Sequence, residues 1–213
     1  MRWLAVAVCL GLAFSTVVAR PAAAQPRDEP VSLFVVDVRG AMPRLGQSPT
    51  TAASLVVNPT ELASRGLGFV AGVHVYPIRR QGWAIGVGGE LLYARASRQI
   101  QIDEETFGPL TRRRFESVSV QVSLNFGHRD GWSYLSGGVG PLAFDTYHDG
   151  FSPDGVRAMT LNYGGGARWF TRPRLAANFD VRLYATRPSN ATPNVGARDP
   201  QTVMVFSVGV SIR

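Results

Sequence analysis

The chain has 213 residues, 23 of them glycine, and only 17% of its residues are charged, which fits one domain and excludes a highly charged disordered chain. Its formal net charge of +7 is carried entirely by arginine. These arginines are scattered over expected turns and loops, so the sequence predicts no nucleic-acid partner. The single cysteine excludes a disulfide framework.

Residues 1–24 have the pattern of a cleavable signal peptide. A short basic start precedes an apolar run over 3–18, and Ala22-Ala23-Ala24 forms a small-residue cleavage pattern. The apolar run is shorter than the roughly 20 residues that a membrane-spanning helix needs. Cleavage would remove two arginines and the only cysteine, leaving a net charge of +5. Residues 25–30 would then be a short periplasmic lead-in to a barrel domain over 31–213.

Alternation of apolar and polar residues recurs along the rest of the chain and predicts strands. In 175–186 the odd positions are apolar, from Leu175 to Ala185, and the even positions are mostly polar. One face of each strand carries no charge, amide or hydroxyl other than that of tyrosine. Seven strands show this pattern, over about 34–40, 67–75, 83–93, 118–126, 159–169, 175–185 and 204–212.

An eighth strand is expected over about 132–144, between the fourth and the sixth. Its composition is typical of a strand, but Pro141 and several glycines obscure which face is which. No run of 18 apolar residues follows the leader, so a membrane-embedded form of this chain must cross the bilayer with strands.

A soluble sandwich or a lipocalin-like cup could also bury one apolar face. The connection lengths favour a membrane barrel, because short and long connections alternate. The expected short turns are 78–82, 127–131 and 171–174, and the expected long loops are 41–66, 99–114, 145–157 and 188–201. We therefore predict an all-β fold, an eight-stranded antiparallel up-and-down transmembrane β-barrel.

All six charges within the clear strands lie on the polar face, which would line the lumen. They are Asp37, Arg39, Glu90, Arg168, Asp180 and Arg182. Eight strands leave an interior that side chains can fill, so these residues are expected to form a salt-bridge network that plugs the barrel. The alternative is a gate whose ion pairs exchange to open a narrow water path.

Four aromatic residues lie beside the expected short turns: Trp83, Trp132, Trp169 and Phe170. Amphipathic rings favour the depth at which lipid meets water, so we expect these four at the membrane interface. Tryptophans packed in an ordinary core are the alternative.

One hairpin carries a specific resemblance. The run Gly164-Gly-Gly-Ala-Arg168-Trp-Phe170, the turn Arg172-Pro173-Arg174 and the strand Asn178-Phe-Asp180-Val-Arg182 look like the penultimate hairpin of small outer-membrane barrels. The chain resembles the outer membrane protein A and X type. The resemblance implies an eight-stranded monomer of the bacterial outer membrane, inserted by the barrel assembly machinery, with outer-membrane lipids and lipopolysaccharide as partners. The chain departs from the family at its end, Ile212-Arg213, where an aromatic residue is usual.

The expected function is a non-enzymatic outer-membrane barrel that serves envelope integrity or surface contact through its loops. A lipid-modifying barrel enzyme, similar to a lipid A deacylase, and a narrow small-solute channel are the alternatives. Candidate catalytic residues for the enzyme are Asp145, His148, Asp149 and Ser152. No cofactor is expected, and no histidine spacing suggests a metal site. The charged stretches of 99–114 are expected to pair with each other, or to contact divalent cations or lipopolysaccharide phosphates.

Overall fold

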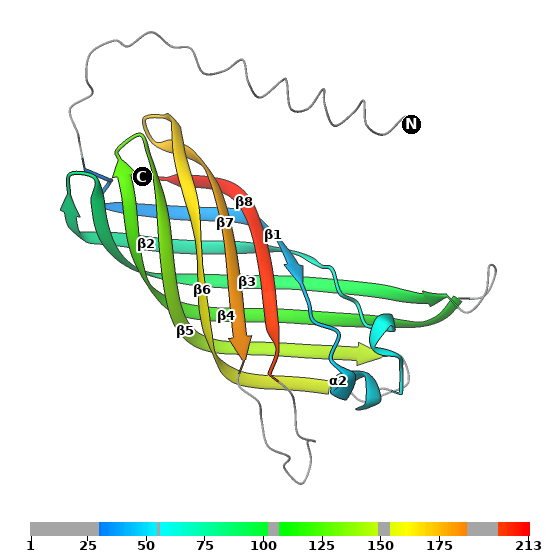
Figure 1. The fold of residues 1–213 in the computed structure, drawn as a ribbon. Helices are drawn as coiled ribbons and strands as arrows, with labels where there is room; N and C mark the ends of the chain where they lie inside the picture. The colour runs from blue at the N-terminus through cyan, green and yellow to red at the C-terminus, as the bar shows by residue number, and fades with distance from the viewer. Residues whose placement is uncertain (1–29, 55, 102–106, 149–153, 187–199) are drawn as a thin grey trace, which may run out of the picture.

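In the computed structural model the chain forms one closed sheet of eight antiparallel strands (Figure 1). The structure describes residues 30–54, 56–101, 107–148, 154–186 and 200–213. The expected leader lies outside these residues. The strands are β1 (Phe34–Arg44), β2 (Leu67–Arg80), β3 (Trp83–Gln101), β4 (Phe107–His128), β5 (Gly131–His148), β6 (Asp154–Arg172), β7 (Leu175–Thr186) and β8 (Thr202–Ile212). A short helix α2 (Pro49–Ser54) and a 3-10 turn η1 (Pro59–Glu61) lie between β1 and β2.

The first and last strands close the barrel. Val38 of β1 pairs with Ala71 of β2 on one side and with Val210 of β8 on the other. Closure leaves no sheet edge with unpaired backbone groups, and this is the only way in which strands can cross a bilayer. Neither helical segment in the described part of the chain is long and apolar enough to cross a membrane.

The apolar face of the sheet points outward. Val120, in the middle of β4, has 69% of its surface exposed, and the exposed large apolar residues recur on every strand. The outward-facing Trp83 and Tyr93 are ten residue steps apart on β3. At about 3.3 Å per residue and a tilt of about 40°, this stretch covers about 25 Å, the height of the apolar band of membrane barrels.

Three tight turns lie at one end of the barrel, which we call the short-turn end (Figure 1). They join β2 to β3, β4 to β5 and β6 to β7. In the first, Gly82 has a φ of 78°, a left-handed conformation that glycine adopts without steric cost. The segment with α2 and η1 lies at the opposite end, which we call the loop end.

Two of the expected long loops are mostly strand. β3 continues to Gln101 and β4 begins at Phe107, so 99–114 is not one loop. The expected loop 145–157 is shortened in the same way by β5 and β6. Beyond the apolar band the outward face of a strand meets water, so polar residues can stand on both faces. Pairs such as Ser97–Arg112 therefore continue the backbone ladder without an apolar alternation that would reveal it.

A charge placed in the middle of the outer face should destabilise the barrel. We expect Val120→Arg to lower the free energy of unfolding by about 2–4 kcal/mol, because the guanidinium would face hydrocarbon at mid-depth. Urea titration of the barrel refolded into phospholipid vesicles measures this change. Ser97→Arg, exposed on β3 beyond the band, is the matched control and should cost about 0–1 kcal/mol. Equal costs for the two variants would contradict an outward-facing apolar band.

Candidate functional site

The lumen contains a network of buried charges centred on Asp37 of β1. Arg168 of β6 donates to this carboxylate through Nε, 3.1 Å from Oδ1, and through Nη2, 2.5 Å from Oδ2. Asn178 Nδ2 and Ser211 Oγ also donate to Oδ1, at 2.9 and 2.5 Å, and His74 Nδ1 lies 3.6 Å from Oδ2. The carboxylate is fully buried, so these donors replace its lost hydration.

The remaining four predicted charges form a second group. Arg39 contacts Glu90 and lies 3.3 Å from Asp180. Arg182 lies 3.4 Å from Glu90 and 3.1 Å from Asp180, so two guanidiniums alternate with two carboxylates. The structure thus brings all six sequence-predicted charges into the lumen, from strands β1, β3, β6 and β7. Three positive groups face three negative ones, and each arginine contacts at least one carboxylate.

Neutral side chains complete this network, and two tyrosines among them were not in the set expected from the sequence. Tyr134 Oη donates to Asp180 at 2.9 Å, and Tyr184 Oη donates to Glu90 at 3.0 Å. The guanidinium of Arg168 also lies 4.3 Å from the centre of the Tyr134 ring. Tyr184 was in phase with the polar face of its strand, whereas the glycines of β5 obscured the direction of Tyr134.

Between the charges and the short-turn end, an aromatic layer fills the lumen. It contains Val31, Val35, Tyr76, Ala84, Trp132 and Tyr134, with Phe170 packed against it. The prediction that Trp132 and Phe170 lie at the membrane interface is therefore wrong. Trp132 is only 2% exposed, and its ring lies 6.0 Å from that of Tyr76 and 5.1 Å from that of Phe170. Closeness to a turn predicts how deep a residue lies along the barrel axis, but the strand phase decides whether its side chain faces lipid or lumen. Both residues are in the inward phase. Trp83 and Trp169 do point outward.

Between the charges and the loop end, an apolar layer fills the lumen. In this layer the ring of Phe115 makes edge-on contacts with those of Phe144 and Tyr184, with ring centres 6.0 and 5.5 Å away. Leu45 and Ala63 also join this layer, so the segment between β1 and β2 covers the end of the barrel. Arg113, which the sequence placed in a loop, is buried here and donates to the backbone oxygens of Gly46 and Ala63 at 2.8 and 3.0 Å.

The candidate catalytic residues are not brought together within the described structure. Asp145 faces outward, where Arg114 and Arg157 each approach it to 2.7 Å. His148 lies three residues further along β5, on the inward phase, with Nδ1 3.4 Å from Thr111 Oγ1. The other two candidates, Asp149 and Ser152, lie outside the described residues. Within the described ranges no three histidine, cysteine or acidic side chains are placed to hold a metal ion.

Removing one member of the lumenal network should unfold the barrel more easily. We expect Asp37→Asn to lower the free energy of unfolding by about 3–5 kcal/mol, because Arg168 would keep its charge without a charged partner. Replacing the pair together, Asp37→Leu with Arg168→Met, should recover much of this loss. Urea titration in vesicles measures both. Asp130→Asn, an exposed turn carboxylate, is the control and should change the value by less than about 0.5 kcal/mol. A cost for Asp37→Asn no larger than that of the control would contradict a paired network.

Comparisons with known proteins find likeness in structure and not in sequence. No protein-family model matches the chain, and no curated protein matches its sequence. Ail, the attachment invasion locus protein of Yersinia pestis, solved in complex with the heparin analogue sucrose octasulfate, has a TM-score of 0.53 at 14% identity. That match covers 86% of this chain and 98% of Ail.

Two further bacterial proteins align over a similar length. Neisserial surface protein A has a TM-score of 0.49 at 14% identity, with 85% of this chain and 97% of that one covered. The outer membrane protease OmpT of Escherichia coli has a TM-score of 0.46 at 7% identity, with 89% and 98% covered. At such identities the likeness carries the fold alone, and one fold serves many functions. The chain has the closed, antiparallel fold of the small eight-stranded outer-membrane β-barrels.

Proposed function

We propose that this protein is a non-enzymatic barrel of the Gram-negative outer membrane whose lumen is plugged by its own side chains. Its role would be in envelope integrity or in surface contact through the loop end. The observation that carries this proposal is the filled interior, in which an aromatic layer, a paired charge layer and an apolar layer follow one another along the barrel axis.

The charge layer argues against an open channel. Arg39 and Arg182 extend across the lumen and each approaches the same two carboxylates, Glu90 and Asp180. Opening a path between them would separate buried opposite charges, which is costly in an interior of low dielectric constant. A gate would need a second set of partners for these charges. The layers on either side contain mainly aromatic and aliphatic side chains, and the polar groups beside Arg182, such as Asn162 and Ser136, are neutral and cannot replace a carboxylate.

The placement of Asp145 and His148 gives no support to the lipid-modifying alternative. A base and a carboxylate that act together must share one site, whereas these two residues are on opposite phases of β5. Asp145 is also held by two arginines in an arrangement that fits a structural ion pair.

The strand lengths support a role at the loop end. β3 to β6 have 18 to 22 residues, whereas the other four have 11 to 14. A barrel strand needs about 9–11 residues to span the bilayer. The longer strands therefore extend past the apolar band and form a ribbon that projects from the loop end (Figure 1). This ribbon is suited to contact with other molecules at the cell surface.

Planar-bilayer recording tests the plugged lumen. We expect the wild-type barrel to give few and small openings. The variant Glu90→Ala with Arg182→Ala removes one charge of each sign and should increase both frequency and size, because space opens without leaving an unbalanced charge. The control Arg129→Ala with Asp130→Ala, in the exposed turn between β4 and β5, should behave as the wild type. Frequent, large openings of the wild type would overturn the proposal and favour a channel.

A further inference from the structure

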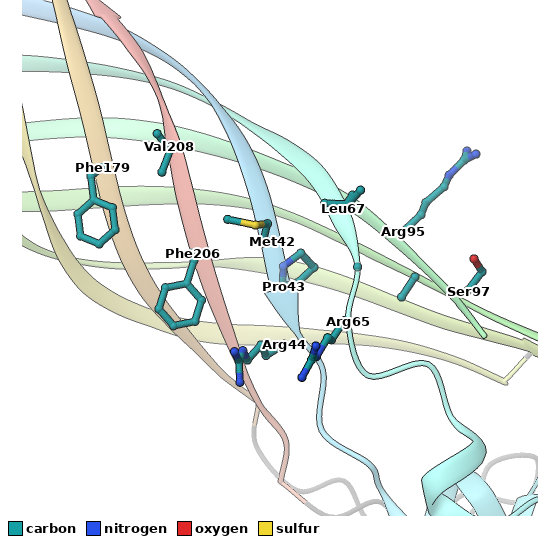
Figure 2. A pocket seen from close by; sticks show the side chains of 12 residues that line it. Met42, Pro43, Arg44, Arg65, Leu67, Arg95, Ser97, Phe179, Phe206 and Val208 are labelled. Atoms are coloured by element: carbon teal, nitrogen blue, oxygen red, sulfur yellow. The ribbon is translucent and has the colours of Figure 1, made fainter. Parts of the chain in front are cut away.

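A groove of about 680 Å³ runs over the outer surface of the barrel where β1, β2 and β8 approach the loop end (Figure 2). Its lower part is apolar, with Met42, Leu67, Phe206 and Val208 among its lining residues. All four are on the outward phase of their strands, so they face lipid in a membrane barrel.

Three arginines line the upper part of this groove. Arg95 pairs with Leu67 across β2 and β3, one outward-facing pair beyond Phe69 and Tyr93. The rings of Phe69 and Tyr93, 5.8 Å apart, mark the upper aromatic level of the band. Arg44 and Arg65 face each other across an isolated bridge beside this level. The arginines thus lie just above the apolar band, at headgroup depth.

These arginines are not neutralised by the described part of the protein. Like charges directly opposite each other on paired strands are destabilising. Yet within the described ranges no carboxylate forms an ion pair with any of the three. The guanidiniums of Arg44 and Arg95 lie over the rings of Phe206 and Tyr93, at 5.8 and 5.1 Å from the ring centres. On another part of the same rim, Arg114 and Arg157 share Asp145. The barrel therefore pairs its rim arginines with an acid in one place and leaves the groove positive.

We propose that this groove binds a phosphorylated lipid of the outer leaflet. The phosphate lies between Arg44 and Arg65, and an acyl chain lies over Met42, Leu67 and Val208. Arg95 adds a third positive charge at the other side of the groove. Guanidinium groups bind phosphate through paired, charge-assisted hydrogen bonds, and an anion between Arg44 and Arg65 removes their repulsion. The inference rests on the outward orientation of the apolar face in the proposed function, and adds to it a lipid class and a binding site.

Native mass spectrometry of the mature barrel in detergent tests this site, with lipid A and its dephosphorylated form as probes. Circular dichroism first confirms that each variant is folded. We expect wild type to retain lipid A, and to retain the dephosphorylated form about tenfold less, since one charge-assisted contact is worth about this factor. Arg44→Gln with Arg65→Gln should lower lipid A retention by about tenfold or more. Arg79→Gln with Arg80→Gln, an equal charge change at the short-turn end, should leave it unchanged.

Three results would overturn the groove as a lipid site. They are equal retention of both lipid forms by the wild type, unchanged retention by the Arg44/Arg65 variant, and displacement of lipid A by an equal concentration of inorganic pyrophosphate. The last would indicate a site for soluble anions, in which the apolar floor has no role. The proposed function would not be affected by any of these three results, provided that the barrel is folded, needs detergent and does not conduct.

Discussion

Pairing between β1 and β8 is the interaction on which the rest of the structure depends. Nine residue pairs, from Val36–Ile212 to Arg44–Met204, join strands that are far apart in the sequence. They turn an open sheet into a cylinder in which every strand has two neighbours. Only then can the sheet expose apolar side chains to lipid without exposing backbone polar groups to it. Closure also creates the enclosed space into which the other half of the side chains must fit.

The inner space explains the polar half of the sequence. A charge on the outer face would lie in hydrocarbon, so every charged group at band depth must point inward and find partners there. Asp37 has several donors, while Arg39, Glu90, Asp180 and Arg182 balance one another. Aromatic and aliphatic layers above and below seal this group from the two ends. The proposed phosphate groove follows the same logic outside the barrel, since charge returns to the outer face only where headgroups begin.

Alternation in the sequence was enough to predict the fold, the facing of seven strands and the membership of the charge cluster, because a strand in a membrane barrel has one apolar and one polar side. It failed where that contrast is absent. Beyond the band the outward faces of β3 and β4 are no longer apolar, so the contrast between the faces is lost, and a paired strand that contains Arg113 is predicted as loop. In β5 glycines and Pro141 hid the phase, which left Tyr134 unassigned. Trp132 was misplaced because depth was judged without regard to its face. The groove arginines come from β1, from the segment just before β2 and from β3, and the register of these neighbouring strands, which alternation does not give, brings them together.

The central claim is that the apolar face contacts lipid and that the lumen is enclosed. The tryptophans of the barrel test it directly, because Trp83 and Trp169 point outward and Trp132 points inward at the same end. Three variants, each retaining one of these tryptophans, would be refolded into vesicles whose acyl chains carry bromine, which quenches indole fluorescence on contact. The account predicts strong quenching of Trp83 and Trp169 and little quenching of Trp132. Strong quenching of Trp132, or none of the other two, would contradict it.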